Sequence, residues 1–174
     1  MKTQSSMQRA LRFGFVLLTT LWLAGCATKP PFPDEVVQSA STVPPPHVLS
    51  EGGGPLPAGP LIWGGVIIST QNLKQDTELT VLSFPLDDDL RPKSEEPTLG
   101  RFLIVRQGFL DPVIYAAGRV VTVVGKVDRI ETRKIDNVDY RYPVIEAQSL
   151  YLWPPKDKSI PVYFSIGVGV HGGF

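Results

Sequence analysis

The stretch that decides the fold is Arg119-Val120-Val121-Thr122-Val123-Val124-Gly125-Lys126-Val127-Asp128-Arg129. β-Branched residues dominate it, and their alternation between two faces is typical of a strand. The predicted faces are Val121, Val123, Gly125 and Val127 on one side, and Val120, Thr122, Val124 and Lys126 on the other. Gly118 and Gly125 fit positions where a strongly coiled strand bends or carries a bulge.

Four more segments predict strands: residues 62–70, 78–84, 101–106 and 142–153. Gly64-Gly65 indicates a bulge or a bend in the first of them. The sequence Asp136-Asn137-Val138-Asp139 predicts a turn before the last strand, which Pro154-Pro155 ends. A short connector joins the third and fourth strands, and its residues 113–117 are compatible with one helical turn.

This order of strands predicts a mainly β fold, an OB-like barrel of five to six strands over residues 61–155. Closing the sheet into a barrel also removes the exposed strand edges that otherwise promote aggregation. An open sandwich is the alternative that the number of strands leaves.

The N-terminal residues 1–25 have the features of a secretory signal peptide. Lys2, Arg9 and Arg12 precede an apolar run over residues 13–23, which is too short for the ~20 residues of a spanning helix. The sequence Leu23-Ala24-Gly25-Cys26 resembles a bacterial lipoprotein lipobox. An ordinary signal peptide that ends near a buried cysteine is the alternative.

The lipobox resemblance implies cleavage between Gly25 and Cys26, with a diacylglycerol on the sulfur and an N-acyl chain on the new N-terminus. These covalent lipids would anchor the chain in a bilayer, and no other cofactor is expected. Ala27 at the sorting position, followed by Thr28, provides no aspartate for retention in the inner membrane. By resemblance to sorted lipoproteins, this implies the outer membrane, with the domain facing the periplasm; exposure at the cell surface is the alternative.

Residues 26–60 form the lipidated N-terminus and a predicted tether. Nine of the 17 prolines lie between residues 27 and 60, together with Gly52-Gly53-Gly54. Such a composition favours an extended linker with a reach of about 100 Å. Docking of Val36-Val37 and Val48-Leu49 on the domain is the alternative.

Composition excludes several classes of function. After removal of residues 1–25 the chain has 149 residues, of which 14 are basic and 17 acidic, a formal charge of −3. This balance argues against a nucleic-acid partner, for which a basic footprint is expected. The single cysteine, Cys26, would carry lipid, so neither disulfides nor a thiolate metal site is expected.

The sequence Gly108-Phe109-Leu110-Asp111-Pro112, followed by Tyr115, Gly118 and the run 121–125 that ends at Gly125, resembles the Slp family of outer-membrane lipoproteins. Trp63-Gly64-Gly65-Val66-Ile67 and Tyr142-Pro143-Val144-Ile145-Glu146 match the family's first and last strands. The resemblance implies a stress- or starvation-associated envelope lipoprotein without an established enzymatic activity, and structural roles for the motif residues.

The sequence contains few candidates for catalytic or metal-binding residues. His47 and His171 have no second histidine or carboxylate at ligand spacing, so neither a metal site nor a catalytic triad is predicted. Asp87-Asp88-Asp89 lacks the spacing of a calcium loop and is interpreted as a solvated loop. Asp111 is expected to fix a turn by accepting backbone N–H groups.

Aromatic residues could provide a stacking face for sugars, although most are expected in the core. They are Trp63, Phe102, Phe109, Tyr140, Tyr142, Tyr151 and Trp153. The tail, residues 156–174, alternates apolar residues with Gly167 and Gly169, which fits either an extra strand or a segment that contacts a membrane or partner.

The sequence therefore predicts a non-enzymatic outer-membrane lipoprotein with a structural or interaction role, whose partners are the bilayer and an envelope protein or saccharide. A ligand-binding module that captures an envelope saccharide or lipid on the barrel face is the second hypothesis.

Overall fold

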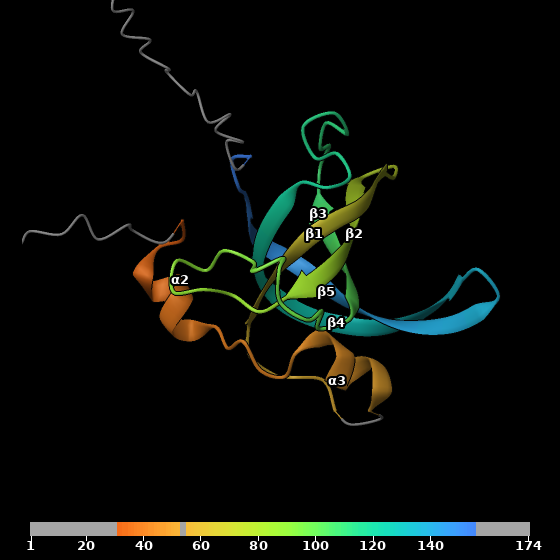
Figure 1. Cartoon of the computed structure of the whole chain (residues 1–174), viewed down its shortest axis with the longest axis horizontal. Helices are drawn as coiled ribbons and strands as arrows, with labels where there is room; N and C mark the ends of the chain where they lie inside the picture. Colours follow the sequence, from red (N-terminus) through yellow and green to blue (C-terminus); the bar gives the residue numbers. More distant parts are fainter. Residues whose placement is uncertain (1–30, 53–54, 156–174) are drawn as a thin grey trace, which may run out of the picture. The chain divides into compact units, whose positions relative to one another are not determined.

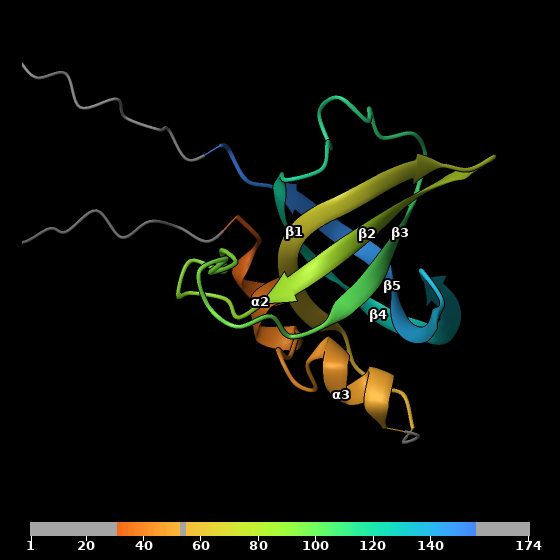
Figure 2. The same cartoon turned by 45° about the vertical axis from the view of Figure 1, so that its right-hand side comes forward.

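The computed structural model describes residues 31–52 and 55–155, which belong to one unit of the chain, Pro31–Phe174. Five strands close into a barrel in the order β1-β2-β3-β5-β4 (Figures 1 and 2). Neighbouring strands are antiparallel except β3 and β5, which are parallel. The strands are β1 (Leu61–Asn72), β2 (Asp76–Phe84), β3 (Arg101–Gln107), β4 (Val120–Ile135) and β5 (Val138–Leu152).

This topology confirms the predicted small OB-like barrel, with five strands in the described residues. All five predicted segments are strands, and β4 and β5 are longer than the sequence indicates. They continue past the barrel to a turn at Asp136 and Asn137, as the sequence predicts.

Two glycines allow the strands to approach each other closely. A Cβ atom added to Gly65 would lie 2.0 Å from the carbonyl oxygen of Leu82, and one added to Gly125 would lie 2.0 Å from that of Glu146. The register between β4 and β5 shifts next to Gly125, where β5 has one extra residue. Gly118 lies in the turn before β4 with φ +85°, a conformation that favours glycine.

The barrel interior is filled by large apolar side chains from all five strands. Val121, Val123 and Val127 point inward, as the alternation of β4 predicts. Their main partners in this core are Leu61, Trp63, Ile67, Leu79, Val81, Phe102, Ile104 and Ile145.

The outer face of β4 is also buried at Thr122, beside Leu90 and Trp153, and at Val124, where the chain before β1 packs on it. Helix α2 (Asp34–Ser39) follows Phe32, whose buried ring joins Ile62 of β1 and Val124 of β4 in a second apolar cluster. Val36 and Val37 pack against the same cluster. Thr122, also on this outer face, is completely buried.

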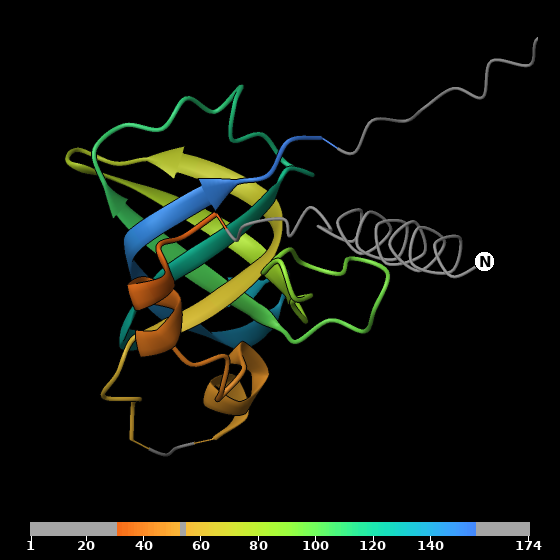
Figure 3. The same cartoon turned by 90° about the vertical axis from the view of Figure 1, so that its left-hand side faces the viewer.

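Helix α3 (Pro46–Glu51) closes the end of the barrel opposite the β3–β4 connector (Figures 1 to 3). Its Leu49 joins the main core. The indole N–H of Trp63 donates to the carbonyl of Pro44 (3.1 Å), and the backbone N–H of His47 donates to the carbonyl of Leu99 (2.9 Å).

The expectation of an extended tether over residues 26–60 is therefore wrong between residues 32 and 51. The prolines here do not keep the chain extended. Pro33 and Pro45 are the N-cap residues of α2 and α3, and Pro46 begins α3, where proline removes no intrahelical hydrogen bond. The apolar residues between the prolines then bury themselves on the barrel.

The outer part of the β4–β5 hairpin is held against the barrel by apolar packing and by hydrogen bonds. Tyr142 and Val144 of β5 pack with Leu103 of β3 in a third buried cluster. The guanidinium of Arg133 donates two hydrogen bonds of 2.6 Å to the buried carboxylate of Glu78 on β2, which raises the pKa of Arg133. Among the described helices, none has the length and apolar character to cross a membrane.

Candidate interaction surfaces

The predicted lipidation and sorting residues, Gly25, Cys26 and Ala27, lie outside the described residues, as do His171 and the tail 156–174. The described part of the chain contains the family motif, the aromatic residues and the acidic loop. These are the regions in which the structure can reveal a site.

The motif Gly108-Phe109-Leu110-Asp111-Pro112 forms a connector with a tightly fixed backbone. The N–H of Leu110 donates to the hydroxyl of Thr77 (3.0 Å), and its carbonyl accepts from the side-chain amide of Asn72 (3.0 Å). The carboxylate of Asp111 accepts the N–H of Val113 (2.8 Å), and its carbonyl accepts the N–H of Tyr115 (2.9 Å), closing a helical turn. Gly108 has φ +90°. The motif therefore builds a rigid turn, with the Leu110 side chain in the core.

The same connector exposes large apolar side chains to solvent. Phe109, Val113 and Ile114 are 73%, 83% and 51% exposed. Leu73 in the β1–β2 turn is 50% exposed, and the N–H of Gly108 joins the two turns by donating to the carbonyl of Gln75 (2.9 Å). We call Leu73, Phe109, Val113 and Ile114 the apolar end. Rigid backbone and exposed apolar side chains together indicate a contact surface.

The other aromatic candidates do not form an open stacking face. Trp63, Phe102, Tyr142 and Trp153 are buried, and Tyr140 and Tyr151 are half-buried. They pack edge to face in pairs, such as Trp63 with Phe102 at 5.2 Å between ring centroids. Of the seven aromatic candidates, only Phe109 is exposed, so these residues mainly fill and cover the barrel.

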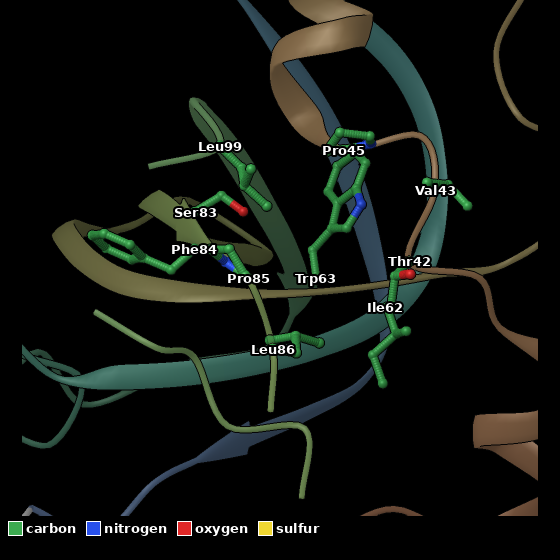
Figure 4. A pocket seen from close by; sticks show the side chains of 10 residues that line it. All are labelled: Thr42, Val43, Pro45, Ile62, Trp63, Ser83, Phe84, Pro85, Leu86 and Leu99. Atoms are coloured by element: carbon green, nitrogen blue, oxygen red, sulfur yellow. The ribbon is translucent and has the colours of Figure 1, made fainter. Parts of the chain in front are cut away.

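A small pocket of about 310 Å³ lies between the segment before α3 and the ends of β1 and β2 (Figure 4). Its walls are mainly apolar, and the hydroxyl of Ser83 already donates to the carbonyl of Gly64 (3.3 Å). The pocket therefore lacks the converging polar groups that would orient a saccharide. The lining residues are Thr42, Val43, Pro45, Ile62, Trp63, Ser83, Phe84, Pro85, Leu86 and Leu99.

The polar candidates have structural partners. His47 Nδ1 lies 3.3 Å from the carbonyl oxygen of Leu99. The carboxylate of Asp87 accepts the backbone N–H groups of Asp89 (3.0 Å) and Arg91 (2.8 Å), which shapes the acidic loop. Within residues 31–52 and 55–155, no group of three or more histidine, cysteine, aspartate or glutamate side chains is placed to hold a metal ion.

Comparison with known proteins identifies the family. The family model of the outer membrane lipoprotein Slp family matches residues 23–168, a range that begins within Leu23-Ala24-Gly25-Cys26 and includes the whole barrel. The chain belongs to the Slp family. It is thus an outer membrane lipoprotein by family, as its motif residues indicated.

Two curated relatives show the extent of the likeness. The uncharacterized lipoprotein YeaY of Escherichia coli is 33% identical over 140 residues, which cover 76% of this chain and 67% of YeaY. The outer membrane protein Slp of Escherichia coli is 34% identical over 91 residues, or 52% of this chain and 48% of that protein. The similar region thus spans about half the length of Slp.

Among solved structures, the Schizosaccharomyces pombe Pot1pC bound to single-stranded DNA is similar, with 17% identity over 65% of this chain and 87% of that chain. The TM-score is 0.28, a value at which the likeness carries no argument about function.

Proposed function

We propose that this Slp-family chain is a non-enzymatic, lipid-anchored envelope module whose barrel faces the periplasm and rests against the bilayer through the apolar end. The observation that carries the proposal is the exposure of Phe109 and Val113 on a backbone fixed by hydrogen bonds. A role under envelope stress is part of the proposal, and the family resemblance supports it.

The short link to the anchor supports a position at the bilayer. Phe32 is already buried on the barrel, so residues 27–31 alone separate the proposed lipidated Cys26 from the folded unit. The six residue steps from Cys26 to Phe32 span about 20–22 Å at most. The barrel would therefore lie at the membrane surface, far closer than the roughly 100 Å that an extended tether would allow.

A second contact with the bilayer would strengthen the attachment of the chain to the membrane. Membrane attachment by acyl chains becomes stable when at least two hydrophobic signals act together. Insertion of an aromatic and two β-branched side chains removes apolar surface from water, at roughly 25 cal/mol per Å². The apolar end would also set the orientation of the barrel, which lipid chains at a single residue cannot do.

Vesicle flotation with the mature chain, residues 26–174, carrying Cys26→Ser tests the proposal, because neither lipid nor the apolar run over residues 13–23 then masks weaker contacts. We expect weak binding of this chain to phosphatidylethanolamine–phosphatidylglycerol vesicles. Adding Phe109→Ser and Val113→Ser should reduce that binding at least about tenfold. The matched control is Val138→Ser, because Val138 is 68% exposed at the tip of the β4–β5 hairpin, away from the apolar end.

Equal flotation of the chains with and without the two serines would contradict bilayer contact. Circular dichroism of each variant separates loss of binding from loss of the fold. The exposed positions of Phe109 and Val113 predict that both serine substitutions leave the fold intact.

A further inference from the structure

A second pocket, of about 240 Å³, lies where the β2–β3 loop, the start of β4 and the end of β5 meet. Arg91 and Arg119 both line it, together with the indole of Trp153 and the hydroxyl-bearing Ser94. The remaining walls are Pro92, Gly118, Val120, Pro154 and Pro155. Two cationic side chains from distant parts of the sequence therefore share one small concave site.

Both guanidinium groups are held in place by backbone carbonyls of the pocket wall. Arg91 donates from Nη2 to the carbonyl of Pro154 (3.2 Å), with its Cζ 5.1 Å from the centroid of the Trp153 ring. Arg119 donates from Nη1 to the carbonyl of Ile114 (2.9 Å) and from Nη2 to that of Trp153 (3.1 Å). The two arginines thus bind adjacent carbonyls, those of Trp153 and Pro154.

None of the ion pairs found in the part of the chain that the structure describes involves Arg91 or Arg119. The ion pairs found there involve Lys93, Arg129, Arg133 and Lys134. The carboxylate of Asp87 accepts the backbone N–H of Arg91 (2.8 Å), a contact that does not involve the guanidinium.

The arginines also keep unused donors. A guanidinium has five N–H groups, of which Arg91 spends one and Arg119 two on the contacts above. The Nε atoms of both side chains are buried and make no hydrogen bond to any described residue. Of the four terminal N–H groups on each guanidinium, about three on Arg91 and two on Arg119 therefore have no acceptor among the described residues and are the donors available to a ligand in the pocket.

We propose that this pocket binds a phosphate group, with Arg91 and Arg119 as the two guanidinium ligands. Phosphate suits the site because its oxygens accept N–H groups from planar guanidinium forks and its negative charge complements the two cations, which form no ion pair with the described residues. Trp153 fixes the plane of Arg91 by stacking, which prepares the fork before the anion arrives. The phosphate is either free in solution or part of a lipid headgroup.

Nuclear magnetic resonance of the full mature chain in a maltoside detergent, which contains no phosphate, tests the site directly. Sodium phosphate should shift the Nε–H resonances of both arginines and the indole N–H of Trp153. Sodium chloride at equal ionic strength should not. A second arm replaces the detergent with nanodiscs that contain phosphatidylglycerol. Shifts with dissolved phosphate indicate a free anion as the ligand, and shifts with the nanodiscs alone indicate a headgroup.

Absence of these shifts in both arms, or equal shifts with chloride, would overturn the proposal. Variants give an independent measure. Arg91→Lys and Arg119→Lys keep the charge but lose the fork, and each should weaken phosphate binding at least about tenfold. Arg129→Lys is the matched control, because Arg129 is half-exposed on β4 and pairs with Asp128. Lysine variants that bind phosphate as tightly as the wild type would also refute the site.

Discussion

At Gly125 the barrel leaves no space for a side chain. The obstacle is the backbone carbonyl oxygen of Glu146, 2.0 Å from where a Cβ would lie, and a backbone atom cannot move aside as the end of a flexible side chain can. The chain must therefore have glycine here for β4 and β5 to keep their register. This is a structural reason for the last residue of the family motif.

We expect Gly125→Ala to destabilise the fold by about 3 kcal/mol or more, because the added methyl group forces the two strands apart. Urea unfolding followed by circular dichroism measures the change. Gly59→Ala is the matched control, since nothing lies within 4 Å of its Cβ position, and its stability should stay within about 0.5 kcal/mol of the wild type. A small effect at Gly125 would show that the close approach to Glu146 is relieved by a shift of the strands.

At the scale of the elements, α3 covers one end of the barrel and has one buried and one exposed face. Leu49 is buried in the barrel core, whereas its neighbour Val48 is 45% exposed. We expect Leu49→Ala to cost about 2–4 kcal/mol, because it leaves a cavity at the closed end of the barrel. Val48→Ala on the same helix should change stability by less than about 0.5 kcal/mol.

Thermal unfolding of the two variants decides whether the segment before β1 is part of the fold. Equal and small effects for Leu49→Ala and Val48→Ala would mean that α3 contributes little to the folded state. The comparison controls for helix propensity, because both substitutions introduce alanine into the same turn.

The strands could be predicted because each one carries its own signal. Alternation of apolar residues in β4, and turn residues such as Asp136-Asn137, act within a few positions of the sequence. The helices α2 and α3 have only six residues each and start at prolines, so local sequence resembles a linker. What stabilises them is burial against residues distant in sequence, such as Val36 of α2 against the cluster of Ile62 and Val124, and Leu49 of α3 in the barrel core.

The candidate interaction surfaces were harder to predict, because they also depend on contacts between residues distant in sequence. The motif identified Phe109, but an exposed phenylalanine has the same sequence signal as a buried one such as Phe102. Arg91, Arg119 and Trp153 belong to three separate segments, and only barrel closure brings them to one pocket. No local pattern in the sequence marks such a site.

At the scale of the whole molecule, the proposed anchor and sorting residues determine where the barrel works. We expect palmitate to label the wild-type chain and not Cys26→Ala. We expect Ala27→Asp to move protein into the inner-membrane fraction, with Ala27→Ser as the control that keeps the outer-membrane distribution. Equal labelling with and without Cys26 would refute lipidation at that residue.

Protease sensitivity measures which side of the outer membrane the barrel faces. A barrel that faces the periplasm should resist protease added to intact cells and become sensitive after the outer membrane is permeabilised. Cleavage in intact cells would instead indicate exposure at the cell surface.

The contact between Phe32 and Tyr151 also determines how the chain can fold. The beginning of the described chain packs against its last strand, and β1 completes the barrel only by pairing with β4. Contacts between residues so distant in sequence slow folding, because the cost of closing long loops comes before the gain from packing. The barrel therefore cannot close until β5 is available to pair with both β3 and β4, so closure has to wait until nearly the whole described chain has been made.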